Sequence, residues 1–140
     1  DLHLCDRRQR QMCIRDSFAI NQLHLDRRAE EYVYVVGLTT KTQALGVFEI
    51  SHGAVSASIC NPREIFIRLL LCGASTFVMI HNHPSGDTNP SKADRMVAQK
   101  LKEAGDLLGI TMIDSIIIGD HYHLSMKENS NAKLLNRMSI

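Results

Sequence analysis

The chain has 140 residues and a formal net charge of +1 at pH 7, and 44% of its residues are hydrophobic. This length predicts one domain with its own core and excludes a full (β/α)8 barrel, which needs about 250 residues. A charge near zero gives no overall field that would attract nucleic acid. The apolar runs are too short to cross a bilayer, so we expect no membrane-spanning segment.

The ends of the chain and its cysteines bear on where the protein works. The four cysteines show neither CxxC spacing nor the spacing of a disulfide framework. No continuous apolar stretch marks a secretory leader. We therefore expect reduced thiols and a cytoplasmic protein. Residues 1–17 lack helical and strand periodicity, and we interpret them as an N-terminal arm that is either non-native or disordered.

The first predicted elements follow a lead-in segment at residues 18–31. Residues 32–38 are rich in Val and Tyr, which predicts a strand, and residues 44–50 predict a second strand that a polar connection joins to the first as a hairpin. Residues 53–58 predict a further short strand. This part of the chain is therefore expected to be β-structure.

A helix is predicted next, because residues 61–64 read Asn-Pro-Arg-Glu. Asn is a favoured N-cap, Pro is favoured at the first helical position, and Glu suits the third. The helix body extends over residues 65–72, and Gly73 is the expected stop. Residues 76–81 form a short apolar run that predicts a buried strand.

The second half predicts another helix and two more strands. Ser91 and Asp94 have the spacing of a capping box, apolar residues follow at helical intervals, and Gly109 ends the helix. Residues 110–118 are rich in β-forming residues, and the turn at Gly119-Asp120 predicts a final strand near residues 122–126. Strands that both adjoin one another and alternate with helices predict an α/β fold with a mixed sheet flanked by helices.

The most informative motif is His81-Asn82-His83, which Asp94 follows across a turn-rich segment. Two imidazoles and one carboxylate form a three-ligand set that leaves the fourth tetrahedral position of zinc open for water. Side chains alternate along a strand, so His81 and His83 are expected to point the same way. We predict that these three residues bind one Zn²⁺ per chain at a catalytic site.

Zinc lowers the pKa of its bound water to about 7, but hydrolysis also needs a base. Glu49 is the candidate, because it stands alone in an apolar strand where burying its charge is costly. An exposed glutamate on an edge strand is an equally good interpretation. Ser91 and Asp94 would by themselves form only a capping box.

The remaining histidines and other zinc motifs add little. His121 and His123 form a second His-x-His, but no third ligand lies nearby, so we expect histidines on a strand surface. His52 is expected to be structural or to support a metal ligand. His-Glu-x-x-His is absent, which excludes a zincin helix, and the deaminase motif is also absent.

These motifs resemble the JAMM signature of the JAB/MPN-type metalloproteases, and the sequence segments around them are similar to those of the bacterial RadC-like JAB domain. The resemblance covers roughly residues 31–128, and we assign residues 32–128 to the domain and 129–140 to a C-terminal tail. The matching segments are Phe48-Glu49-Ile50-Ser51-His52-Gly53, Asn61-Pro62-Arg63-Glu64, His81-Asn82-His83-Pro84-Ser85-Gly86, Leu101-Lys102-Glu103-Ala104-Gly105 and Ile116-Ile117-Ile118-Gly119.

The resemblance implies a curved mixed sheet between helices, zinc on His81, His83 and Asp94, and Glu49 as general acid/base. It also implies that Ser91 helps to position the oxyanion or the water. Two positions depart from the family: Asn61 and Ser115 stand where many relatives carry His. Neither position is a metal ligand in the motif, so zinc binding is expected to persist.

The expected function is zinc-dependent hydrolysis of an amide bond in a peptide or protein substrate, by a peptidase or isopeptidase. A non-catalytic JAB-type scaffold or DNA-repair accessory protein is the alternative, and it would have no need of an open metal site. The sequence His-Asn-His also suggests a metal-dependent nuclease. A near-neutral chain without a basic stripe gives that function little support.

Overall fold

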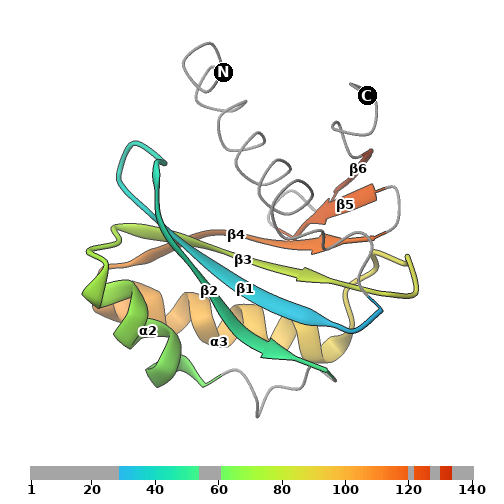
Figure 1. Cartoon of the computed structure of the whole chain (residues 1–140), viewed down its shortest axis with the longest axis horizontal. Helices are drawn as coiled ribbons and strands as arrows, with labels where there is room; N and C mark the ends of the chain where they lie inside the picture. The colour runs from blue at the N-terminus through green and yellow to red at the C-terminus, as the bar shows by residue number, and fades with distance from the viewer. Residues whose placement is uncertain (1–28, 54–60, 120–121, 127–129, 134–140) are drawn as a thin grey trace.

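The computed structural model describes residues 29–53, 61–119, 122–126 and 130–133 (Figure 1). The predicted arm at residues 1–17 and nearly all of the predicted strand at residues 53–58 lie outside this part. The elements in chain order are β1 (Tyr32–Leu38), β2 (Ala44–His52), α2 (Pro62–Leu71), β3 (Thr76–Asn82), α3 (Lys92–Leu108), β4 (Thr111–Ile118), β5 (Tyr122–Ser125) and β6 (Ser130–Lys133).

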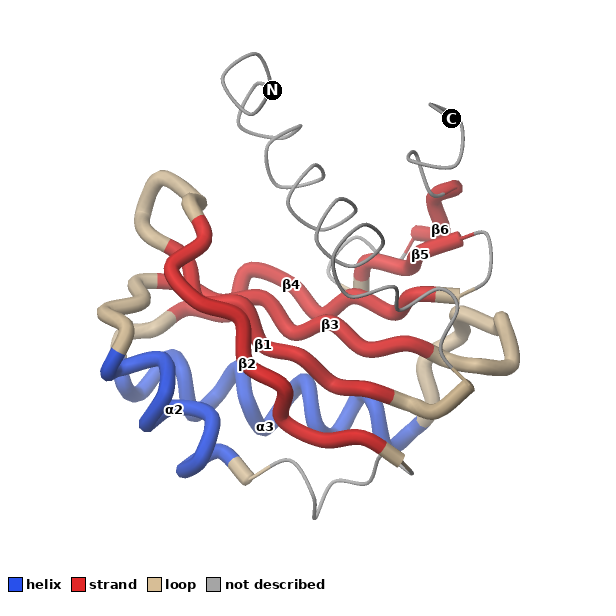
Figure 2. Tube along the Cα trace, in the orientation of Figure 1, coloured by secondary structure: helices blue, strands red, loops and turns tan. Residues whose placement is uncertain are grey.

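The strands form one sheet in the order β2-β1-β3-β4-β5-β6. The β3–β4 pair is parallel, and the other neighbouring pairs are antiparallel. Helices α2 and α3 lie against the same face of this sheet (Figure 2). The mixed α/β fold expected from the sequence is confirmed.

Local signals in the sequence define the two helices. The Asn61 side chain accepts a hydrogen bond from the Arg63 N–H at the start of α2. After its end, Gly73 adopts a φ of 73° that an L side chain rarely takes. Ser91 and Asp94 form the expected capping box of α3, and Gly109 closes that helix with a φ of 75°.

The core is divided between the two faces of the sheet. Phe77 and Met79 of β3 pack on the helix side, where Leu101 of α3 is fully buried. Val78 and Ile80, the alternate residues of the same strand, belong to a second apolar cluster on the other face. Because β3 is covered on both faces, the strand that leads to the predicted metal motif is rigidly held.

Two features differ from the sequence expectations. Strand β6 pairs with β5 within the predicted tail, where no strand was expected. His123 is buried, so the expectation of a surface histidine is wrong for this residue. Its register partner is Ile118, whose side chain belongs to the apolar cluster on the sheet face away from the helices. His121 lies outside the described residues.

The described residues also bear on membrane and thiol expectations. None of their helices is both long and apolar enough to cross a bilayer. Cys72 is a free thiol, half-buried against the helix-side core. Its Sγ donates a weak hydrogen bond to the carbonyl oxygen of Leu69. The residue fills space at the end of α2, as expected for a small apolar side chain.

Candidate metal centre

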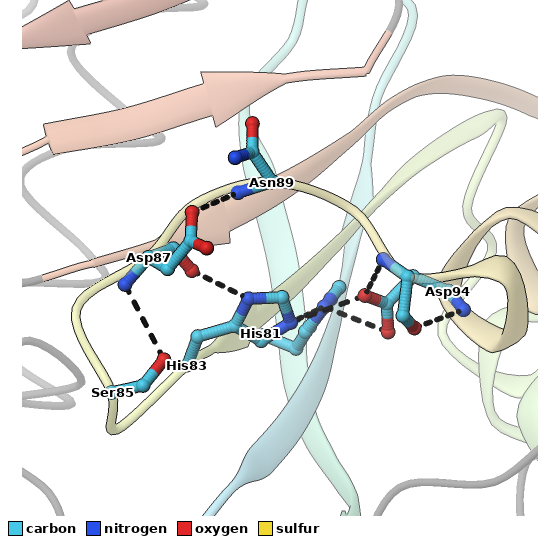
Figure 3. A network of polar contacts seen from close by, with 7 residues as sticks. His81, His83, Ser85, Asp87, Asn89 and Asp94 are labelled. Carbon is cyan, nitrogen blue, oxygen red and sulfur yellow. Dashed lines mark hydrogen bonds and ion pairs between the residues drawn. The ribbon is translucent and has the colours of Figure 1, made fainter.

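Three side chains from two elements converge at one end of the sheet (Figure 3). His81 lies near the end of β3, His83 follows that strand directly, and Asp94 lies in the first turn of α3. One ligand atom from each residue lies within 4.8 Å of the other two. Among the described residues, this is the group of histidines and acidic residues that could hold a metal ion. The structure thus brings together the three residues that the sequence singled out.

The distances within the group are short, with each histidine next to a different oxygen of the Asp94 carboxylate. The Nε2 atoms of His81 and His83 are 3.3 Å apart. His81 Nε2 lies 3.3 Å from Oδ1 of Asp94, and His83 Nε2 lies 3.1 Å from Oδ2. A tetrahedron with metal–ligand bonds of about 2.0–2.1 Å has edges of about 3.3 Å. The donor set therefore suits zinc in its chemistry, and the two Nε2 atoms have the spacing of one tetrahedral edge.

A hydrogen bond outside the group orients the His83 ring. Its Nδ1 lies 2.8 Å from the carbonyl oxygen of Asp87, to which it donates a proton. In the neutral imidazole this leaves Nε2 as the acceptor that faces His81 and Asp94. A lone pair directed at a carboxylate needs a proton or a cation between them. Metal-binding histidines are held in the same way by a partner on the other nitrogen.

The carboxylate of Asp94 is fixed by the start of its own helix. Its Oδ2 accepts a hydrogen bond of 2.8 Å from the Ser91 N–H, and the Asp94 N–H donates to Ser91 Oγ over 3.1 Å. The side chain is buried, with only 5% of the residue exposed. The capping box and the predicted metal site therefore share the Asp94 carboxylate, and the geometry is compatible with both interpretations of this residue.

The charges within the group shift two pKa values in opposite directions. Burial works to raise the pKa of Asp94, but hydrogen bonds with His81, His83 and the Ser91 N–H together hold that pKa well below its usual range. The pKa of His83 is raised, chiefly by its hydrogen bond to Asp94, although burial opposes the shift. Asp94 is thus a carboxylate at neutral pH, ready to bind a cation.

The two predicted catalytic residues lie at different distances from this group. Ser91 lines a cavity of about 250 Å³ together with His83 and Asp94, so its hydroxyl is beside the predicted ligands. Glu49 is exposed on β2, and its carbonyl oxygen accepts a hydrogen bond from Arg68 Nη1. Its strand partner is Tyr34, while His81 pairs with Val33 one position along. Glu49 as the base therefore stays a prediction.

Glu31 is a site residue that the sequence analysis missed. It lines the same cavity as His83 and Asp94, and its negative charge contributes to the raised pKa of His83. The residue directly precedes β1, where the sequence gives no chemical motif. Only the pairing of β1 with β3 brings it to the site, so no local signal identifies it.

Asn82, between the two histidines, is a second missed residue and is 0% exposed. Its Oδ1 accepts a hydrogen bond of 2.6 Å from the Tyr32 N–H, and its Nδ2 donates to the Glu30 carbonyl over 2.9 Å. The Glu31 carbonyl in turn accepts from the Gly53 N–H. These bonds hold the backbone around Glu31 against β3. An amide at the end of an apolar strand was the available signal.

The loop between His83 and Ser91 packs against the end of β4. His83 donates its N–H to the Ile118 carbonyl at 2.9 Å. A Cβ added to Gly119 would lie 2.5 Å from the Gly86 carbonyl oxygen and 2.7 Å from Thr88 Cγ2. Only a glycine permits this close approach. The position of the loop that follows His83 therefore depends on the residue after β4.

Comparison with known proteins identifies the family. The family model described as RadC-like JAB domain matches residues 12–131. A UPF0758 protein of Alkaliphilus metalliredigens is 44% identical over 101 residues, which are 72% of this chain and 44% of that protein. A UPF0758 protein of Methanosarcina acetivorans is 41% identical over 121 residues, covering 86% and 53%.

A UPF0758 protein of Clostridium tetani is 42% identical over 99 residues, which are 71% of this chain and 43% of that protein. The chain thus spans about half the length of these curated relatives. The family match covers most of the chain and agrees with the mixed sheet described above. The chain belongs to the RadC-like JAB domain family.

Proposed function

We propose that this protein is a zinc-dependent hydrolase of peptide or isopeptide amide bonds, with the metal held by His81, His83 and Asp94. The observation that carries the proposal is the convergence of the three side chains: the two Nε2 atoms lie 3.3 Å apart, and each lies 3.1–3.3 Å from an oxygen of the Asp94 carboxylate. A ligand set of two histidines and one aspartate leaves a coordination position for water. Structural zinc sites, by contrast, use all four positions for protein ligands.

Bound zinc would supply a Lewis acid that polarises a carbonyl and lowers the pKa of water to about 7. The residues of the chain would orient the substrate and move the proton. The Ser91 hydroxyl accepts a bond from the Asp94 N–H, so its own proton is available to a substrate carbonyl oxygen. A donor at this place would stabilise the charge that develops on that oxygen.

Two carboxylates are candidates for the base that removes the proton from the attacking water. Glu49 is the residue that the family resemblance favours. Glu31 is the residue that lines the cavity with His83 and Asp94. A base must come within hydrogen-bond reach of the proton it removes, and a substrate complex can tighten contacts that are longer in the free protein. We propose Glu49 as the base and treat Glu31 as the alternative at this one step.

The test compares three glutamine variants under identical zinc loading. Purified wild type, Glu49→Gln, Glu31→Gln and the control Glu64→Gln are assayed on fluorogenic peptide-amide and lysine-isopeptide substrates. Glu64 is an exposed residue of α2 whose carboxylate lies 3.8 Å from Arg63. We expect Glu49→Gln to keep its zinc and to lose roughly 10²–10⁴-fold in kcat, and Glu64→Gln to match wild type.

Each other outcome has a defined meaning. Equal activity of wild type and Glu49→Gln contradicts Glu49 as the base, and a selective loss in Glu31→Gln moves that role to Glu31. A zinc-loaded wild type that cleaves neither substrate class contradicts the hydrolase proposal and favours the scaffold alternative.

A further inference from the structure

A second cavity, of about 330 Å³, lies between α3 and β4 and shares no lining residue with the predicted metal site. Its volume falls within the usual range for small-molecule sites. Its apolar surface includes Ala98 of α3, Met112 of β4 and Met126 just after β5. Its polar groups include Arg95 and Ser115. A cavity with a mostly apolar surface and a few polar groups is typical of small-molecule binding.

Ser115 supplies a polar atom inside this cavity that the protein does not satisfy. The residue is 3% exposed, and its hydroxyl oxygen has no hydrogen-bond partner among the described residues. Its strand partner is Met79, which belongs to the helix-side core, so the hydroxyl faces α3. Buried hydroxyls in native proteins are nearly always hydrogen-bonded. A ligand with a polar atom would provide the missing partner.

The charge at this cavity favours an anion. Arg95 is exposed and makes no ion pair with any described carboxylate, and Lys102 lies 3.6 Å from Asp106. The Asp114 carboxylate is already engaged, since it accepts hydrogen bonds from the Ser115 N–H and the Ser125 hydroxyl. Asp114 also pairs with Val78, whose side chain lies on the sheet face away from the helices. The guanidinium of Arg95 is therefore the available charged group.

We propose that this cavity binds a small organic carboxylate. The carboxylate pairs with Arg95 at the exposed side, and the apolar body lies against Ala98, Met112 and Met126. A polar atom at the inner end accepts a hydrogen bond from Ser115. An arginine guanidinium suits this role because its planar donors match the two oxygens of a carboxylate. The inference does not depend on the proposed hydrolase activity, because no predicted metal ligand lines the cavity.

The test follows the methionine methyl groups by NMR in protein labelled with ¹³C-methyl methionine. The probes are 6-hydroxyhexanoate and 6-hydroxyhexanamide, called hexanoate and hexanamide below, whose terminal hydroxyl can accept from Ser115; these and inorganic phosphate are titrated separately into the zinc-loaded full chain. Met112 and Met126 report on the cavity, while Met79, buried in the helix-side core, and Met96, exposed on α3, are internal references. We expect saturable shifts of the two cavity methyls with hexanoate, at least roughly 10-fold weaker binding of hexanamide, and no shift with phosphate.

Two variants locate the interaction. Arg95→Gln is expected to bring hexanoate down to the affinity of hexanamide. Lys100→Gln removes an exposed cation from the same helix that does not line the cavity, and is expected to leave hexanoate binding unchanged. Because Arg95 follows Asp94, the zinc content of each variant is measured alongside.

Three results would overturn the proposal. They are no saturable shift at Met112 and Met126, equal affinity for hexanoate and hexanamide, and unchanged hexanoate binding in Arg95→Gln. Ala98→Leu is a further test of the binding site. The added side-chain volume in the cavity is expected to reduce hexanoate binding without changing the charge. Retained binding in a folded Ala98→Leu protein would place the ligand elsewhere.

Discussion

Asp94 has two tasks that its position makes compatible. As the third residue of α3 it caps the helix through the Ser91 N–H, and the same carboxylate faces both histidines. Negative charge is also favoured at a helix N-terminus, where the peptide dipoles leave partial positive charge. The cap therefore holds the predicted ligand in place without a metal, which would reduce the conformational entropy lost on metal binding.

The raised pKa of His83 gives the metal-free protein a definite pH dependence. A folded pKa above the unfolded value of about 6.5 means that folding favours the protonated ring, chiefly through Asp94. This stability is complete below about pH 6.5 and is lost as pH rises through the folded pKa. We expect the free energy of unfolding of wild type, relative to His83→Gln, to fall as pH rises from about 6 to 8.

Urea unfolding in the presence of a chelator measures this difference. Subtracting the His83→Gln curve removes the contributions of the other histidines, provided that they titrate alike in both proteins. A difference in the free energy of unfolding that stays constant, or that grows with pH, would contradict a raised pKa of His83 in the folded protein.

Asn82 is expected to be important for stability although it binds no metal. Replacing it with Ala leaves the Tyr32 N–H and the Glu30 carbonyl without their side-chain partners. We expect Asn82→Ala to lower the free energy of unfolding by roughly 2–4 kcal/mol, as lost hydrogen bonds and buried unpaired groups combine. Asn89→Ala, an exposed control, should change it by less than about 0.5 kcal/mol. Equal effects in chemical denaturation would show that Asn82 does not clamp the strand.

The group of His81, His83 and Asp94 could be predicted from the sequence because its members are close along the chain. His81 and His83 are two residues apart, and Asp94 follows in the next element, so local turns can assemble them. Glu31 reaches the site only through strand pairing, which one sequence does not reveal. The sequence also gave no means of distinguishing a base from an exposed strand residue at Glu49.

Helix α3 links folding and chemistry, and Ser91 allows the two to be separated. We expect Ser91→Ala to lower stability by about 0.5–2 kcal/mol, because the Asp94 N–H loses its cap. Ser91→Asp restores a capping oxygen but has no hydroxyl proton to donate at neutral pH. Thermal unfolding should therefore recover in Ser91→Asp, while amide hydrolysis should not. Recovery of both would limit Ser91 to a capping role.

The contact between the end of β4 and the loop that follows His83 leads to a second prediction at the scale of elements. Gly119→Ala adds a methyl group where the Gly86 carbonyl and Thr88 already lie, so the loop must move. We expect at least a tenfold loss in zinc affinity, in line with other changes that displace supporting groups. The comparison is Gly73→Ala, which strains a φ of 73° at the end of α2 but meets open space.

Zinc affinity is measured for both glycine variants by competition with a chromophoric chelator. Gly73→Ala should cost about 1–2 kcal/mol of stability and leave zinc binding intact. Wild-type affinity in Gly119→Ala, or an equal loss in both variants, would contradict the support of the loop by β4.

Most elements were predictable because their signals are local. The cap at Asn61 and the glycines after both helices fixed the helix ends to within about a residue. The apolar runs at residues 32–38 and 76–81 matched β1 and nearly all of β3. Strand β6 escaped because its four residues, Ser130–Lys133, lack β-branched and aromatic side chains. It is a strand only because β5 offers it an edge.

In the part of the chain that the structure describes, the sheet and α3 are organised around a βαβ unit. Strands β3 and β4 are parallel, α3 connects them, and the predicted ligands lie where β3 ends and α3 begins. Loops at the carboxyl ends of parallel strands are a common place for binding sites in α/β proteins. The sequence predicted a mixed sheet, but not that β1 would lie between β2 and β3, because this order depends on long-range pairing.

The most direct test of this account is the zinc content of purified protein by elemental mass spectrometry. Wild type, Asp94→Ala and His83→Ala are compared with Asp106→Ala, which removes an exposed carboxylate of the same helix. We expect about one zinc per chain in wild type and Asp106→Ala, and none in the two variants of the predicted ligands. Zinc retained in Asp94→Ala and His83→Ala, or no zinc in wild type after loading, would contradict it.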